Sequence, residues 1–255
     1  MSERIRLGGM ALGNGVLVHG PTAWACAVRT EKGDVKIVSA RKRFPAAHVR
    51  NPLLRGPARL AEVFALVPLL KRALPEAELP MARASVVGAM VGSAALVQGL
   101  RRSEVRPFAR ELVTALLSVA PAALSLRGGD LAAYHGAEHI SIGSYEHGEA
   151  RPREHERCGS HLVGPMLLTT AAGNLLAERA PEGLRRPARA AGALGAVAAS
   201  VELFGWMTRN PDHKLARALA RPGHELQHRF GTREPSAQQL EVAEAALHAC
   251  LELEG

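Results

Sequence analysis

The stretch from Tyr134 to Ser160 concentrates residue types that bind metals or transfer protons. His135 and His139 are four positions apart, so on a helix they project from one face about one turn apart. Glu138 stands between them and completes H-x-x-E-H, the inverse of a zinc-protease motif. Two imidazoles at this spacing can bind one ion at about 2.0–2.1 Å, the usual zinc–nitrogen distance. Glu138 points aside from that ion and is placed to act as a general base on water.

A catalytic zinc site needs a third protein ligand and one open position. Glu202 is the main candidate because it is the lone carboxylate in the apolar segment 190–207, where a buried charge requires a cation. Pairing with an arginine is the structural alternative. Nearer residues that could replace a ligand or support the site are Tyr134, Glu146, His155, Arg157 and Cys158. Completion by Glu202 predicts an open catalytic site, whereas completion from the nearer loop predicts a closed structural one.

The element that must position the two histidines is a helix from Leu131 to about Ile142, with Asp130 as its N-cap. Gly136 inside this helix costs about 1 kcal/mol relative to alanine. That cost is tolerable where a substrate or a neighbouring helix must approach the backbone.

Apolar residues make up 47% of the 255-residue chain and aromatic residues only 4%, which favours closely packed helices. Four segments are uncharged or nearly so: 84–100, 112–126, 162–177 and 190–207. A spanning helix needs about 20 apolar residues, so these are marginal. Mean hydropathy is −0.01, which favours a soluble bundle or a protein with much mass outside a membrane. Both interpretations stay open on pattern alone.

Three segments are expected in order along the chain. Residues 1–50 hold a glycine-rich start and a β-hairpin of Ala23–Arg29 and Val35–Ala40. Residues 51–210 form a helical bundle, which begins with an amphipathic helix around 60–72 and carries the H-x-x-E-H motif. Residues 211–255 end in an amphipathic helix that a Ser236/Gln239 capping box begins.

The net charge is +8 and the pI about 10.1, carried mostly by arginine. This balance favours an anionic neighbour, either a membrane surface or nucleic acid. No stretch interleaves basic with aromatic residues, so nucleic-acid binding is disfavoured but open. Cys26, Cys158 and Cys250 are widely spaced and indicate a reducing compartment rather than a disulfide framework. The start of the chain lacks the apolar region of a cleavable signal peptide.

A set of short motifs is spread over nearly the whole chain. They are Gly8-Gly9 with Gly20-Pro21, Asn51–Gly56, Tyr134–His139, Tyr145-Glu146, His155–Gly159, Glu202 in its apolar segment, Arg221–Gly223 with Gln227, and Thr232–Pro235 with Glu241–Ala243. This set resembles the motifs of the YqhQ-like family of bacterial proteins, a domain of unknown function described as a predicted metal-dependent enzyme. The chain departs from the family pattern at Asn14, His19 and Ile140.

The resemblance implies a helical, membrane-embedded protein of the bacterial cytoplasmic membrane, with polar regions facing the cytoplasm and a metal site on the central motif. A cytoplasmic location is the alternative. We therefore expect a mainly α protein, a bundle of about four to five apolar helices with a small N-terminal β-hairpin region. The function expected is that of a membrane-associated, zinc-dependent hydrolase of peptide or other amide bonds, in which His135, His139 and Glu202 bind the ion and Glu138 activates water.

Two other functions remain open. One is a membrane scaffold or assembly factor with a structural metal. The other is a basic RNA- or ribosome-associated protein, favoured only by the charge. The sequence specifies neither the substrate nor the oligomeric state.

Overall fold

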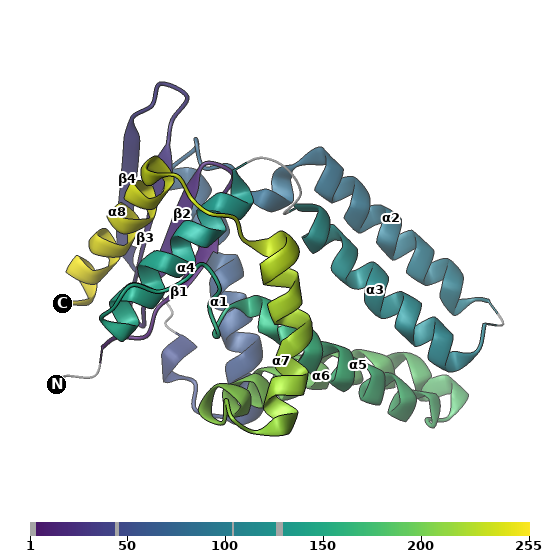
Figure 1. The fold of residues 1–255 in the computed structure, drawn as a ribbon. Coiled ribbons are helices and arrows are strands. Elements are labelled where there is room, and N and C mark those ends of the chain that lie inside the picture. The colour runs from purple at the N-terminus through teal and green to yellow at the C-terminus, as the bar shows by residue number, and fades with distance from the viewer. Residues whose placement is uncertain (1–3, 44–45, 104, 126–129) are drawn as a thin grey trace.

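The computed structural model describes residues 4–43, 46–103, 105–125 and 130–255. The chain is mainly helical, with an N-terminal four-stranded antiparallel sheet, as the sequence predicts in its main lines. Figure 1 shows helices on both faces of the sheet and two helical hairpins that project away from it. The candidate site lies where these parts meet.

The sheet has the order β1 (Gly8–Ala11), β2 (Gly15–His19), β3 (Ala23–Arg29) and β4 (Val35–Arg41), so β1 and β4 are its edges. The predicted hairpin is confirmed as β3–β4, with Gly33 at a φ of 90° in its turn. The sequence did not predict β1 and β2, because glycine is depleted in strands.

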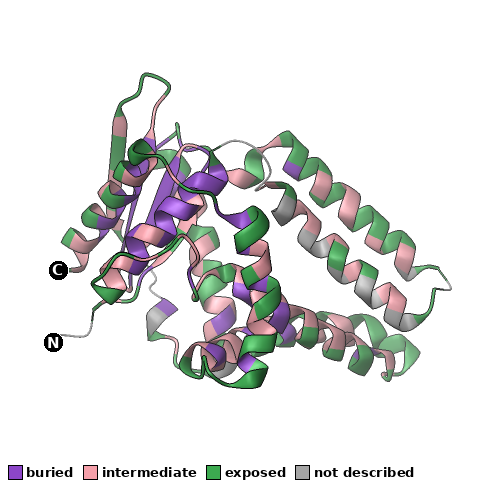
Figure 2. Ribbon diagram, viewed as in Figure 1, coloured by how far each residue is buried: buried purple, intermediate pink, exposed green. Residues whose placement is uncertain are grey.

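The two faces of the sheet bury different cores, following the two-residue period of its strands. Val16, Val18 and Ala27 pack against α4 (Leu131–His147) and α8 (Ala237–Glu254). Leu17, Trp24 and Cys26 pack against α1 (Pro52–Ala73) on the opposite face. Buried residues accordingly gather in the sheet and α4 (Figure 2). Because α8 covers the sheet, the expected segments 1–50 and 211–255 share one core.

Helices form in all four predicted apolar segments: α2 (Ala84–Arg101), α3 (Pro107–Ser125), α5 (Val163–Glu178) and α6 (Arg185–Arg209). The described residues of the hairpins they form, α2–α3 and α5–α6, are mostly exposed or half-buried, with few buried ones (Figure 2). α7 (Lys214–Leu226) runs between the hairpins and the sheet. Shorter elements are the 3-10 helices η1 (Ala46–His48), η2 (Pro80–Ala82), η3 (Gly159–Leu162) and η4 (Glu182–Leu184), and the π-helix η5 (Gln227–Gly231).

One segment among the described residues, Glu182–Arg209, is long and apolar enough to cross a membrane. It has 28 residues and a mean hydropathy of 1.4, and 22% of its apolar window is buried. α2 is apolar but shorter. Length and composition alone therefore leave membrane insertion open.

α4 is longer than predicted, because it continues to His147 and ends at Gly148 in the left-handed conformation. Asp130 occupies the N-cap position, but its carboxylate accepts from Gln239 Nε2 at 3.1 Å instead of capping the helix. Gly136 allows a close approach, as its helical position suggested: a Cβ there would overlap the carbonyl oxygen of Arg233. The segment after η5 thus lies directly on α4.

Candidate metal centre

One face of α4 lines a cavity of about 390 Å³. Leu131, His135, Glu138, His139 and Ile142 all reach it, as positions i, i+4, i+7, i+8 and i+11 of one helix face do. The opposite face of α4 packs on the sheet. The helix is therefore oriented by its apolar core so that its motif faces the cavity.

His135 and His139 are held in the same tautomer by backbone carbonyls. Nδ1 of His135 lies 2.7 Å from Gly231 O, and Nδ1 of His139 lies 2.6 Å from Arg153 O. A carbonyl oxygen only accepts, so each Nδ1 carries the proton and each Nε2 presents a lone pair. Metal-binding histidines are oriented in this way, by a hydrogen bond from the nitrogen that does not bind the ion.

Nε2 of His139 is buried and has no hydrogen-bond partner among the described residues. A buried polar atom without a partner costs about 1–3 kcal/mol unless something else satisfies it. Burial also lowers the pKa of His139, which keeps the ring neutral and able to donate its lone pair.

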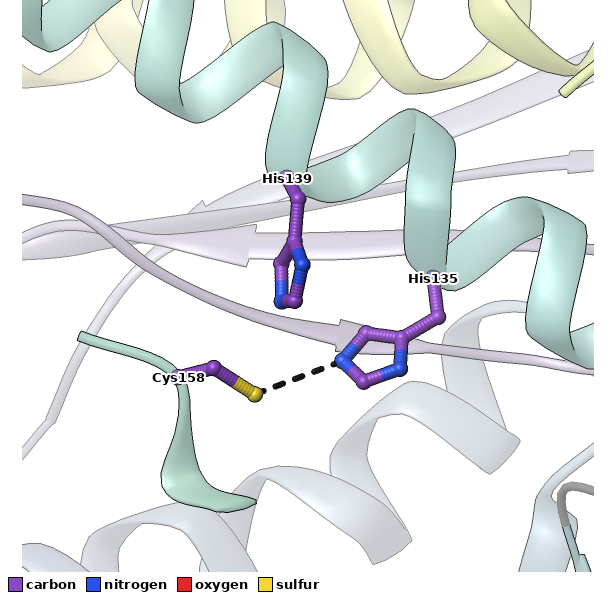
Figure 3. A group of neighbouring side chains, drawn as sticks. All are labelled: His135, His139 and Cys158. Atoms are coloured by element: carbon purple, nitrogen blue, oxygen red, sulfur yellow. Dashed lines mark hydrogen bonds between the residues drawn. The ribbon is translucent and has the colours of Figure 1, made fainter. Parts of the chain in front are cut away.

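Cys158 supplies a third donor from the loop that follows α4. Its Sγ lies 3.5 Å from Nε2 of His135, and the ligand atoms of His135, His139 and Cys158 all lie within 4.8 Å of one another. Figure 3 shows the two rings descending from α4 toward the thiol. We refer to these three residues as the His2Cys group.

Gln227 fixes the loop that carries Cys158. Its fully buried amide accepts from His155 N at 3.0 Å and donates to His155 O and to Ser160 Oγ, at 3.2 and 2.6 Å. It thereby clamps both flanks of Cys158. Gln227 begins η5 and Gly231 ends it, so this π-helix holds the loop at one end and His135 at the other.

Glu138 is buried, with 7% of its surface exposed, and lies against the edge strand β1. A Cβ at Gly9 would overlap the Glu138 carboxylate, so only glycine allows this approach. Burial raises the pKa of Glu138, while the nearby His135 and His155 act in the opposite direction. A carboxyl group with a raised pKa is suited to accept and return a proton near neutral pH.

His155 reaches the cavity in the opposite tautomer. Its Nδ1 accepts from Arg157 N at 3.3 Å, so Nε2 carries the proton. That Nε2 is 3.5 Å from a Glu146 carboxylate oxygen and has no hydrogen-bond partner among the described residues. Glu146 in turn pairs with Arg157 and accepts from Leu7 N. His155 therefore presents an N–H beside the Glu146 carboxylate rather than a further lone pair.

The comparisons with known proteins bear on the part of the chain that holds this group. A family model described as "Protein of unknown function (DUF1385)" matches residues 130–253. This segment, just under half of the chain, is therefore similar to that family. No curated protein and no solved structure matches the chain. The DUF1385 segment contains the whole His2Cys group, Glu138 and Gln227, and it agrees with the resemblance drawn from the motifs.

Two residues considered as ligands lie elsewhere. Both oxygens of Glu202 accept from the Arg55 guanidinium, so an ion pair between α6 and α1 satisfies this carboxylate. Glu202 is not in the group of potential ligands found among the described residues, where Cys158 stands as third donor. Tyr134 is buried in the core between α4 and the sheet, and burial raises its pKa. Tyr134 therefore packs in the core and does not line the cavity.

The residues present fit a zinc ion. One thiolate and two neutral imidazoles are donors that zinc prefers, and the unpartnered Nε2 of His139 is where such an ion would be expected. Sequence reasoning missed the supporting groups, namely the carbonyls of Arg153 and Gly231, Gly9 and the clamp by Gln227. A backbone carbonyl leaves no signal in a sequence. Gly9 and Gln227 were visible only as positions in motifs.

Proposed function

We propose that the protein is a membrane-associated, zinc-dependent hydrolase of amide bonds. The observation that carries this proposal is the His2Cys group, placed beside a buried carboxylate on the wall of a cavity. Three protein donors with an adjacent cavity correspond to a catalytic zinc site, which keeps one position open. A structural site has four protein ligands, so this arrangement favours catalysis over the scaffold alternative.

A bound zinc ion would supply Lewis acidity, which polarises a carbonyl oxygen and activates water. Glu138 takes one proton from the attacking water as the water oxygen adds to the amide carbon. The same carboxyl group returns that proton to the nitrogen as the C–N bond breaks. Water is the only co-reactant, and the products are a carboxylic acid and an amine.

The membrane association rests on the two helical hairpins. α2 is uncharged from Ala84 to Leu100 and exposes large apolar side chains, among them Val91 at 65% and Leu96 at 60%. The α5–α6 hairpin likewise exposes Leu176 and Leu194, at 64% and 67%. Exposed apolar surface of this extent marks a membrane or protein contact.

The packing inside the α5–α6 hairpin supports lipid over protein as that contact. Gly173 and Gly192 face each other at the crossing, where a Cβ on either would lie 3.2–3.3 Å from the other's carbonyl oxygen. Thr169 Oγ1 reaches Ala196 O across the same interface at 3.1 Å. Small residues and interhelical hydrogen bonds of this kind hold helices together in bilayers.

The catalytic proposal is tested with Glu138→Gln. We expect this variant to keep its zinc and to lose hydrolysis of a mixed peptide pool by about 10²–10⁴-fold, because only the proton transfer is removed. Mass spectrometry of the new amino termini measures the rate. Hydrolysis at the native rate in Glu138→Gln would contradict the assigned role. The membrane proposal is tested by flotation of the purified chain with liposomes that contain anionic lipid.

A further inference from the structure

β1 is an edge strand, and no strand among the described residues pairs with its second edge. Leu12 N bonds to Gly15 O at 2.8 Å, and β1 pairs with β2 in the register Met10↔Leu17 and Gly8↔His19. Pairs alternate along an antiparallel ladder, so the even-numbered residues of β1 bond to β2. Gly9 and Ala11 therefore direct their N–H and C=O groups away from the sheet.

Leu7 confirms this direction, because it belongs to the same odd-numbered set. Its N–H donates to the Glu146 carboxylate at 3.0 Å, outside the ladder. Among the described residues, the outward groups of Gly9 and Ala11 have no such hydrogen-bond partner. Unpaired donors and acceptors along an edge are a template for another strand.

The cavity follows this edge. All residues of β1 line it, together with Glu138 and the His2Cys group. Gly8 and Gly9 place no side chain on that stretch of strand, and Gly9 touches the Glu138 carboxylate. A chain laid along β1 would thus pass beside both the donors and the general base.

We propose that the substrate is an extended polypeptide segment that binds by adding a strand to the open edge of β1. This inference rests on the proposed hydrolase function, which it deepens by naming the substrate class and how it is held. Main-chain bonds to Gly9 and Ala11 align the segment, and they recur at every second residue of the ligand. A strand rises about 3.3–3.4 Å per residue, so four-residue β1 spans about four residues of substrate.

A polypeptide suits this edge better than a small amide does. The free groups of β1 alternate donor and acceptor at the spacing of a peptide backbone, and a small amide matches only one of them. Recognition through main-chain groups also fits a cavity wall that along β1 carries two glycines and an alanine beside Met10.

The test uses zinc-loaded Glu138→Gln protein and a fluorescent library of random decapeptides. Binding is measured by anisotropy, and the tightest peptides are then resynthesised with one N-methyl group at each position in turn. Strand addition predicts that methylation weakens binding at least tenfold at alternating positions near the site and has little effect between them. Loss without this two-residue period, or no saturable binding by any peptide, would overturn the proposal.

A proline pair provides the matched control within the protein. Ala11→Pro removes an outward N–H of β1 and places the ring where the ligand strand would lie. Ser39→Pro likewise removes an outward backbone N–H on β4, because the main-chain groups of Ser39 point away from β3 at the opposite edge of the sheet. We expect Ala11→Pro alone to lose peptide binding at least tenfold, with a zinc content matching that of Ser39→Pro. Equal peptide binding by the two variants contradicts the edge proposal.

These outcomes separate the two proposals. Zinc binding and amide hydrolysis without periodic N-methyl effects would contradict the strand-addition proposal and support the hydrolase proposal. Periodic N-methyl effects on peptide binding by a protein that binds no zinc would contradict the hydrolase proposal and support strand addition.

Discussion

At the scale of single residues, the decisive feature is which nitrogen of each histidine carries the proton. Backbone carbonyls accept hydrogen bonds from Nδ1 of His135 and His139, which leaves the lone pairs of the two Nε2 atoms near Cys158. His155, a few ångströms away, has its proton on the other nitrogen because a backbone N–H occupies Nδ1. The three neighbouring imidazoles therefore differ in role: His135 and His139 offer lone pairs to an ion, and His155 offers an N–H.

Cysteine reactivity tests this assignment at the same scale. Burial raises the pKa of Cys26 to about 12 and that of Cys250 to about 11, so neither forms a thiolate near neutral pH. Cys158 lines the cavity. We expect iodoacetamide to label Cys158 first in protein stripped of metal, and zinc to slow that labelling at least tenfold. Peptide mass spectrometry of the native fold locates the label. Equal labelling of Cys158 with and without zinc would contradict its role as a donor.

At the scale of elements, α4 is positioned by two close contacts that glycine makes possible. Gly136 admits the Arg233 carbonyl, and Gly9 admits the Glu138 carboxylate. The first contact brings η5 onto α4, so that Gly231 can hold His135. The geometry of the site therefore depends on packing between elements distant in sequence.

Alanine substitutions at two helical glycines separate packing from helix propensity. Gly136→Ala forces a backbone carbonyl to move, and we expect the metal-free protein to lose about 1–3 kcal/mol of unfolding free energy. Gly88→Ala in α2 meets nothing within 4 Å, so better helix propensity should stabilise it by up to about 1 kcal/mol. Urea denaturation measures both. Stabilisation of similar size in the two variants would show that the Arg233 carbonyl does not press on α4.

Most of the secondary-structure elements could be predicted from the sequence, because helices and hairpins leave short-range patterns of apolar and turn residues. The apolar segments, the helix bearing His135 and His139, the β3–β4 hairpin and the capping box of α8 all follow from short-range patterns. β1 could not be predicted, because its glycines are unusual in a strand and are explained only by a close contact with α4 in the folded chain. The sequence favours Glu202 as a metal ligand because a lone carboxylate in an apolar segment needs a cationic partner. It does not identify that partner, since Arg55 is 147 positions away. The sequence does not single out Cys158 from its neighbours, because the fold of its loop depends on the distant Gln227.

At the scale of the whole molecule, the chain combines a packed α/β/α unit with two apolar hairpins. Pro80 and Ser125, at the base of the α2–α3 hairpin, line the cavity, and α5 begins shortly after Cys158. If the hairpins lie in lipid, the candidate centre lies next to the membrane surface. The three cysteines, Cys26, Cys158 and Cys250, are free.

Global stability should fall on mild acidification. Burial, followed by the charge of Lys42, lowers the pKa of His19 to about 4, and burial does the same for His161. The unfolded chain takes up protons near pH 6.5, whereas the folded chain keeps these rings neutral. Their stabilisation is therefore complete above pH 6.5 and is lost as the pH falls toward 4, by an amount on the order of 3 kcal/mol for a fully buried ring.

Urea titrations at pH 7 and pH 5 of metal-free protein measure this loss. His19→Gln keeps an acceptor for Lys42 and cannot be protonated, so the difference in unfolding free energy between the two pH values should shrink. An unchanged difference would mean that His19 is not held neutral in the folded chain.

Metal content of the purified chain tests the central claim most directly. We predict about one zinc per chain in the native protein by inductively coupled plasma mass spectrometry. The exposed-site control His248→Ala and the ion-pair variant Glu202→Gln should keep that content. His139→Ala and Cys158→Ser should lose most of it while remaining folded by circular dichroism. Absence of zinc from the native protein at zinc excess would contradict the account. So would a Glu202→Gln variant that loses zinc while Cys158→Ser retains it.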